Sequence, residues 1–128
     1  MPHLVVQYSA NLEPDFDLTA LCRQLCDALS AHPAFERGGI RVRAVRCEHV
    51  AIADDAPDNA FADMVLRIAA GRSAEVKQAA GEALFETASA FFASRLETPH
   101  FALSLEIREI MPGTSWKKNT IHPRLQAG

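Results

Sequence analysis

Residues 61–110 read FADMVLRIAAGRSAEVKQAAGEALFETASAFFASRLETPHFALSLEIREI, and the order of patterns in this stretch decides the fold. Apolar residues fall at every second position of 61–70, which is the period of a strand with one buried face. A helix is expected from Ser73, whose side chain can cap it, to about Leu96. Alternation returns in residues 102–110, so the stretch is predicted to fold as strand, helix, strand.

The side chains predicted to face the core share the spacing of their element, which is every second residue in a strand and steps of three and four in a helix. They are Met64, Leu66 and Ile68 in the first strand, Val76, Ala80, Ala83, Leu84, Thr87, Ala88 and Phe91 in the helix, and Leu103, Leu105 and Ile107 in the last strand. An amphipathic helix that packs on one face of two strands follows from this arrangement.

The same order of elements precedes this stretch. Residues 3–9 alternate as a strand, and Asp15 or Asp17 can cap a helix that runs to about Ser30. A second strand begins with alternating residues after a glycine pair, but the alternation changes phase after Ala44. Because an extra residue in a ladder restores the phase of a strand, we predict a β-bulge or bend at this point.

The chain is therefore a doubled β-α-β unit, with pseudo-repeats at about 2–53 and 60–110 and a tail at 111–128. Helices that connect neighbouring strands favour parallel pairing within each half, with right-handed crossovers. We predict an α+β fold, a two-layer α/β sandwich in which a four-stranded mixed sheet carries both helices on one face. We expect the whole chain, 1–128, to form a single domain.

The opposite face of the predicted sheet also carries apolar side chains. Val5, Phe61, Val65 and Ile110 lie on it among polar residues. This face is too apolar to be left in water, and a symmetric oligomer would bury it.

Composition limits the function classes that fit. The formal net charge of −3 argues against nucleic acid or an anionic membrane as the main partner, because both require a basic footprint. The apolar runs are far shorter than the roughly 20 residues that span a bilayer, and no signal-peptide pattern opens the chain, so we expect a cytoplasmic protein. The three cysteines are expected to be free thiols, with Cys22 and Cys26 packing in a helix rather than holding a metal.

The second residue is the first candidate for chemistry. If Met1 is removed, Pro2 presents a secondary amine at the start of a strand. An α-amine titrates near working pH, and apolar surroundings or nearby cations would hold more of it in the neutral, basic form. Pro2 would then suit the role of a general base. On its own, a proline at this position is more often an ordinary residue without a function.

Three arginines are candidates for binding an acid. Arg41 and Arg43 project from one face of the second strand, and Arg72 stands at a strand-to-helix turn after Gly71. A guanidinium holds a carboxylate in a bidentate fork, and the helix start after Arg72 adds anion-binding character. The alternative is that these arginines are solvated surface charges paired with some of the sixteen acidic residues.

Taken together, these pieces resemble the tautomerase superfamily and, within it, the 5-carboxymethyl-2-hydroxymuconate isomerases. The resemblance rests on the opening Pro2-His3 before an apolar strand and on three further stretches, Gly38-Gly39-Ile40-Arg41-Val42-Arg43-Ala44, Ala70-Gly71-Arg72-Ser73 and Ala102-Leu103-Ser104-Leu105-Glu106-Ile107. It covers nearly the whole chain, and the spacing of the motifs after Met-Pro makes it specific. The segment 45–60 and the tail after Pro112 depart from the family pattern, and the tail is where substrate selectivity could differ.

The resemblance implies a homotrimer with a tautomerase/MIF-like fold that needs no metal or organic cofactor. It implies that Pro2 is the catalytic base and that Arg41 and Arg72 bind the substrate carboxylates. Arg43 matches the same pattern and is counted with them as a substrate-binding candidate, without a definite role. The implied reaction is a proton shift in 5-carboxymethyl-2-hydroxymuconate, an unsaturated 2-hydroxy acid from the degradation of homoprotocatechuate.

Two alternatives remain open at this point. A tautomerase could act on a different acid, such as phenylpyruvate or a haloacrylate. A trimer of the same fold could also bind an acidic metabolite or a protein partner without turnover. Retention of Met1 would separate the readings, because Pro2 would then be a tertiary amide without a basic lone pair.

Overall fold

The structure is a computed structural model, and it describes residues 1–127. Its elements in chain order are β1 (His3–Ser9), the 3-10 turn η1 (Ala10–Leu12), α1 (Leu18–Ser30), the 3-10 turn η2 (Arg37–Gly39), β2 (Arg41–Cys47), β3 (Ala60–Ala69), α2 (Ala74–Phe91), α3 (Ala93–Leu96), β4 (Phe101–Ile110) and α4 (Ile121–Ala127). No helix within these residues is long and apolar enough to cross a membrane.

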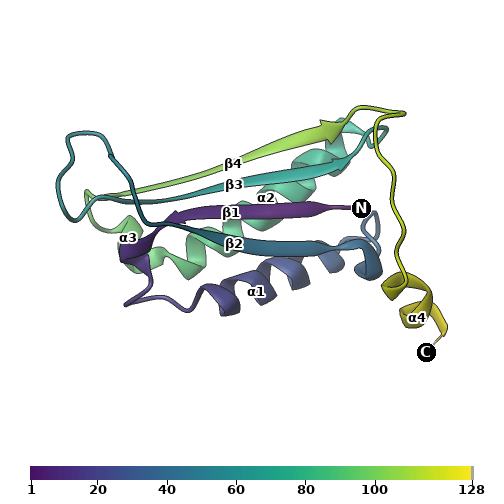
Figure 1. The fold of residues 1–128 in the computed structure, drawn as a ribbon, viewed down its shortest axis with the longest axis horizontal. Coiled ribbons are helices and arrows are strands. Elements are labelled where there is room, and N and C mark those ends of the chain that lie inside the picture. The colour runs from purple at the N-terminus through teal and green to yellow at the C-terminus, as the bar shows by residue number, and fades with distance from the viewer. Residues whose placement is uncertain (128) are drawn as a thin grey trace.

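One four-stranded sheet joins the two halves of the chain, in the order β2-β1-β3-β4 (Figure 1). β1 pairs in parallel with β2, and β3 pairs in parallel with β4. The two halves meet where β1 runs antiparallel to β3. Both long helices, α1 and α2, cover the same face of the sheet. The predicted α+β class, the mixed sheet and the two helices on one face are confirmed.

The core lies between the sheet and the two helices. Its fully buried side chains include Leu4 and Val6 of β1, Met64, Leu66 and Ile68 of β3, Leu21 and Leu25 of α1, and Leu84, Ala88 and Phe92 in and after α2. The inward residues predicted for β3 are therefore confirmed. Each large aliphatic side chain buried in this way contributes roughly 1.5–3 kcal/mol to folding, before conformational entropy is counted.

Two caps agree with the sequence pattern. The Asp17 carboxylate accepts from the backbone N–H groups of Thr19 and Ala20, so Asp17 rather than Asp15 caps α1. Ser73 accepts from the N–H of Val76 at the start of α2. Each cap supplies an acceptor to a helix N–H that has no partner within its helix.

The predicted bulge in the second strand is wrong. β2 keeps an unbroken register with β1 from the pair His3–Arg41 to the pair Ser9–Cys47. The phase changes without an extra residue because Arg46 lies on the helix side at the sheet edge, where its guanidinium is 3.2 Å from the Glu13 carboxylate. The same carboxylate accepts from the Tyr8 hydroxyl, and burial together with this hydrogen bond raises the pKa of Tyr8 to about 12.

The predicted helix to Leu96 is also wrong in its last turn. α2 ends at Phe91, and α3 begins after Phe92. Phe92 is fully buried and packs edge-on against Phe16, with 5.0 Å between ring centroids. The break lets Phe92 enter this aromatic cluster. Ala83, which was predicted to face the core, is exposed.

Candidate active site

The candidate site lies across the strand ends at one end of the sheet, where β1 and β2 begin and β3 and β4 end. We refer to this row of strand ends as the edge. Figure 1 shows the amino terminus at this edge, with the tail from Ile110 passing across it to α4. The amino terminus lies here because β1 runs antiparallel to β3, so the start of β1 is beside the end of β3.

Pro2 is buried at this edge. Its carbonyl oxygen accepts a hydrogen bond of 3.0 Å from the backbone N–H of Arg41, which fixes the start of β1 to the start of β2. Met1 precedes it and lines the hollows on both sides. Pro2 is thus rigidly placed, and Met1 lies between it and the open space.

Arg41 and Arg72 lie on opposite sides of Met1. One nitrogen of the Arg41 guanidinium donates to the Gly39 carbonyl oxygen at 3.3 Å and lies 3.4 Å from the Met1 sulfur. Arg72 follows Gly71, whose φ of +107° makes the turn after β3 possible and strongly favours glycine. Each arginine lines a hollow that Met1 also lines, so the structure brings both of them to the edge that carries the amino terminus.

The Arg72 side chain is held by its neighbours. Its guanidinium donates to the carbonyl oxygens of Ala69 and Ala34 at 3.3 and 3.2 Å. It also lies over the ring of Phe35, 4.8 Å from the centroid. Stacking and two backbone acceptors orient the guanidinium plane before any ligand arrives.

Arg43 lies elsewhere. It is exposed on the face of the sheet opposite the helices, and its guanidinium is 3.4 Å from Nδ1 of His3. It lines a separate hollow with Asp63 and Arg108. The structure therefore gathers Pro2, Arg41 and Arg72 around Met1 and leaves Arg43 on the open sheet face.

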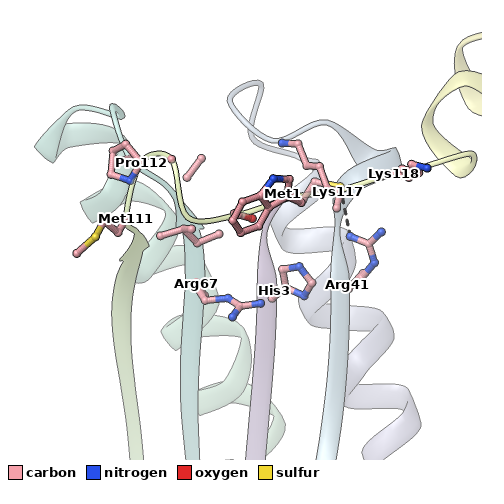
Figure 2. A pocket seen from close by; sticks show the side chains of 14 residues that line it. Met1, His3, Arg41, Arg67, Met111, Pro112, Lys117 and Lys118 are labelled. Carbon is pink, nitrogen blue, oxygen red and sulfur yellow. Dashed lines mark hydrogen bonds between the residues drawn. The ribbon is translucent and has the colours of Figure 1, made fainter.

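Two hollows flank Met1, and both are also lined by Lys117. The first, of about 580 Å³, lies over the strand ends, and tail residues that include Met111, Pro112 and Lys117 line it (Figure 2). The second, of about 470 Å³, lies between η2, Arg72 and the tail. Together they offer room for an extended small molecule on both sides of the amino terminus.

The lining of these hollows is strongly basic. The cations of the first hollow are Arg41, Arg67, Lys117 and Lys118, and its lining contains no Asp or Glu. The second adds Arg72, and its one carboxylate, Glu36, is 2.7 Å from Nε2 of His122. Within residues 1–127, none of these five Arg and Lys residues forms a salt bridge. In a chain of net charge −3, such an excess of cations is suited to an anionic ligand.

The same surroundings change the pKa values of the groups at the amino terminus. Burial lowers the pKa of the Met1 amine, and the positive charges of Lys117, Arg72 and Arg41 lower it further. The pKa of His3 is lowered by burial first and then by Arg67, Arg41 and Arg43. An amine at this edge is therefore biased toward its neutral form, which is the form that accepts a proton.

The described residues offer no cluster of metal ligands. In the portion from Met1 to Ala127, no three His, Cys, Asp or Glu side chains converge as a metal site would require. Cys22, Cys26 and Cys47 are free thiols, and Cys22 and Cys26 lie on α1 away from both hollows.

Sequence reasoning missed the contribution of the tail. Lys117, Asn119 and His122 all line the second hollow. From the sequence, the tail is predicted as a place where selectivity could differ, without a role for these three residues. Trp116 lines the first hollow and is 88% exposed, so it walls open space rather than packing within the chain. The tail lacks a helical or strand period over these residues, so no pattern in it indicated where it would lie.

Comparison with known proteins decides the family. The family model for 5-carboxymethyl-2-hydroxymuconate isomerase matches residues 2–125. A 5-carboxymethyl-2-hydroxymuconate Delta-isomerase of Escherichia coli is 39% identical over 122 residues, which are 95% of this chain and 97% of that protein. The chain belongs to the 5-carboxymethyl-2-hydroxymuconate isomerase family. The resemblance predicted from the motifs is confirmed, and the protein is an isomerase of the tautomerase type.

Solved structures within the family, and others at low sequence identity, share the fold. A crystal structure of a 5-carboxymethyl-2-hydroxymuconate isomerase from Deinococcus radiodurans R1 is 42% identical, with a TM-score of 0.90 over 97% of this chain and 93% of that one. A fused 4-OT described as a symmetric trimer is 19% identical, with a TM-score of 0.62 over 91% of this chain and 93% of that one. The predicted tautomerase/MIF-like fold is confirmed.

Proposed function

We propose that the protein isomerises 5-carboxymethyl-2-hydroxymuconate without a metal or organic cofactor, with Pro2 as the base after removal of Met1. The observation that carries this proposal is the position of the amino terminus, at the junction of two hollows whose Arg and Lys residues form no salt bridge within residues 1–127. A neutral amine and a set of free cations are the two components that a proton shift in a polycarboxylate requires.

The proposed reaction moves one proton. The neutral Pro2 nitrogen takes the proton from the 2-hydroxyl group of the dienoate and returns it to a distant carbon, which gives the conjugated 2-oxo-3-ene acid. Arg41 and Arg72 bind carboxylates and stabilise the negative charge that develops on the oxygen at C2. Arg72 is suited to this role because it is already oriented by Phe35 and by two carbonyl oxygens. Arg43 has no step in this proposal.

The state of the amino terminus provides the first test. Intact mass spectrometry of the native protein should find Met1 removed. An ultraviolet assay with 5-carboxymethyl-2-hydroxymuconate, with phenylpyruvate as a second substrate, then identifies the reaction. Retention of Met1 in active protein would exclude Pro2 as a base, since the nitrogen would be an amide.

The Pro2→Ala variant provides the second test. It keeps a free amine but loses the secondary amine and its ring, so kcat should fall at least about tenfold while the assembly persists. Unchanged turnover would remove Pro2 from the mechanism. Tight binding of the acid by wild type without any turnover would favour the alternative of a non-catalytic binding module.

We also propose that the protein acts as a homotrimer in the cytoplasm, in the catabolism of aromatic acids such as homoprotocatechuate. Two observations support the trimer. The sheet face opposite the helices carries half-buried apolar side chains, among them Val5 and Val65. A protein of the same fold, the fused 4-OT, is described as a trimer.

A further inference from the structure

The tail segment 115–119 crosses the edge that carries the amino terminus, and Lys117 lies at its centre. Figure 2 shows Lys117 beside Met1, near the ends of the strands that carry His3 and Arg41. Met1 and Lys117 are the two residues that line both hollows. A ligand that extends from one hollow into the other must therefore pass the Lys117 side chain.

The backbone after Lys117 is held in place. The Asn119 carboxamide donates to the Gly38 carbonyl oxygen at 2.8 Å, and its Oδ1 accepts from the backbone N–H groups of Ile121 and His122. His122 is in turn 2.7 Å from the Glu36 carboxylate. These contacts fix the tail to η2, so the position of Lys117 is set by the fold rather than by a free chain end.

The Lys117 ammonium has no acidic partner among residues 1–127. Arg72 and Arg41, by contrast, already donate to backbone carbonyl oxygens. The positive charge of Lys117 acts on the amino terminus more strongly than that of either arginine. An ammonium on a flexible stem, close to the reacting position and without a partner, is suited to a carboxylate of the ligand.

The substrate of the proposed function has three carboxylates, and the two arginines account for two of them. We propose that Lys117 binds the third carboxylate and is a specificity-determining residue, selecting tricarboxylates over acids with a single carboxylate. This inference rests on the proposed function for the identity of the substrate. It assigns Lys117 to binding and gives it no proton to transfer.

The test compares Lys117→Met with Lys77→Met in the processed full-length protein. Lys77 is a matched control because its ammonium pairs with Glu109 at 3.4 Å and lines neither hollow. For 5-carboxymethyl-2-hydroxymuconate, Lys117→Met should raise KM about tenfold or more and leave kcat within about threefold, because a charge-assisted contact made equally in ground and transition states is lost. Lys117→Arg should recover most of the affinity, and Lys77→Met should match wild type.

A monocarboxylate supplies the contrast. For phenylenolpyruvate, the KM, or the inhibition constant if it is not turned over, should stay within about twofold in Lys117→Met, because the lost contact has no counterpart in that ligand. An equal loss with both compounds would overturn the inference. A fall in kcat with KM unchanged would also overturn it, because Lys117 would then act on the amine rather than on a carboxylate.

Failure of the proposed function is distinguishable from failure of this inference. If wild type turns over neither compound, the proposed function fails, and calorimetry still measures how tightly the tricarboxylate binds. Equal dissociation constants for wild type and Lys117→Met would then overturn the role of Lys117. Weaker binding in Lys117→Met alone would support it without any turnover.

Discussion

At the scale of single residues, the surroundings of the amino terminus set the pKa of its amine. Burial is the largest cause of the lowered pKa at Met1, ahead of the charges of Lys117, Arg72 and Arg41. In the proposed mechanism the amine belongs to Pro2, which is one residue deeper and is itself buried. The same two causes, desolvation and nearby cations, therefore act on the amine that would do the chemistry.

The pH dependence of kcat/KM tests whether the pKa of the Pro2 amine is lowered. A lowered pKa keeps the amine neutral to lower pH, so the acidic limb of kcat/KM should lie below the ordinary α-amine range of about 7.7–8.0. Salt should move the limb upward only in part between about 0.01 M and about 1 M, because ions screen the cations but not the burial. A limb at or above the ordinary range in processed enzyme would contradict this account.

At the scale of elements, the strands and the candidate arginines could be predicted because periodicity and motif spacing are local properties. Alternation in β3 and the cap at Ser73 follow from residues a few positions apart. The break at Phe92 could not be predicted, because it depends on Phe16, which is distant in the chain. The absence of a bulge in β2 likewise depends on Glu13, because its carboxylate forms a salt bridge with the Arg46 guanidinium at the edge strand.

The tail could not be placed from sequence for the same reason. Its position depends on contacts of Asn119 and His122 with Gly38 and Glu36, about eighty residues earlier. These are single polar contacts, and no periodic pattern accompanies them. The residues of the site that were missed, Lys117 above all, are those that such long-range contacts position.

The contact between η2 and α4 leads to a prediction for Gly38→Ala. A Cβ at Gly38 would lie 2.5 Å from Cα and 2.7 Å from Cβ of His122, so the tail must shift. We expect the variant to lose about 1–3 kcal/mol of stability where the tail remains docked, or to release the tail. Trypsin cleavage after Lys117 and Lys118, followed by mass spectrometry, should be faster than in wild type, and KM for the tricarboxylate should rise.

Gly81→Ala is the matched control for that variant. Gly81 lies within α2, and a Cβ there would meet only Cδ1 of Ile107, at the ordinary distance of 3.4 Å. Replacing a helix glycine by alanine stabilises by up to about 1 kcal/mol, so the melting temperature should be unchanged or higher. Tail cleavage should match wild type. Equal cleavage in the two variants would mean that Gly38 does not control docking of the tail.

At the scale of the whole molecule, the two faces of the sheet differ in what covers them. One face is covered by α1 and α2, whereas no element among residues 1–127 covers the other (Figure 1). On that open face, Val65 pairs across the strands with Val5 and lies next to Glu106 of β4. All the half-buried apolar residues predicted there, Val5, Phe61, Val65 and Ile110, lie on it. Association of identical chains is the arrangement that would remove them from water.

The proposed homotrimer leads to a prediction for Val65→Lys. A lysine at the centre of the open face would place an unpaired charge in each buried interface of a trimer, and such a charge costs several kcal/mol. The variant should therefore elute near the chain mass of 14.0 kDa in size-exclusion chromatography with light scattering, while wild type elutes at three times that mass. Phe85→Lys is the control, because Phe85 is already 41% exposed on α2, in the other layer, and its charge would stay in water. If Val65→Lys still forms a trimer, the open sheet face is not the interface. If wild type elutes as a single chain, there is no trimer, and Val5 and Val65 form a solvated patch.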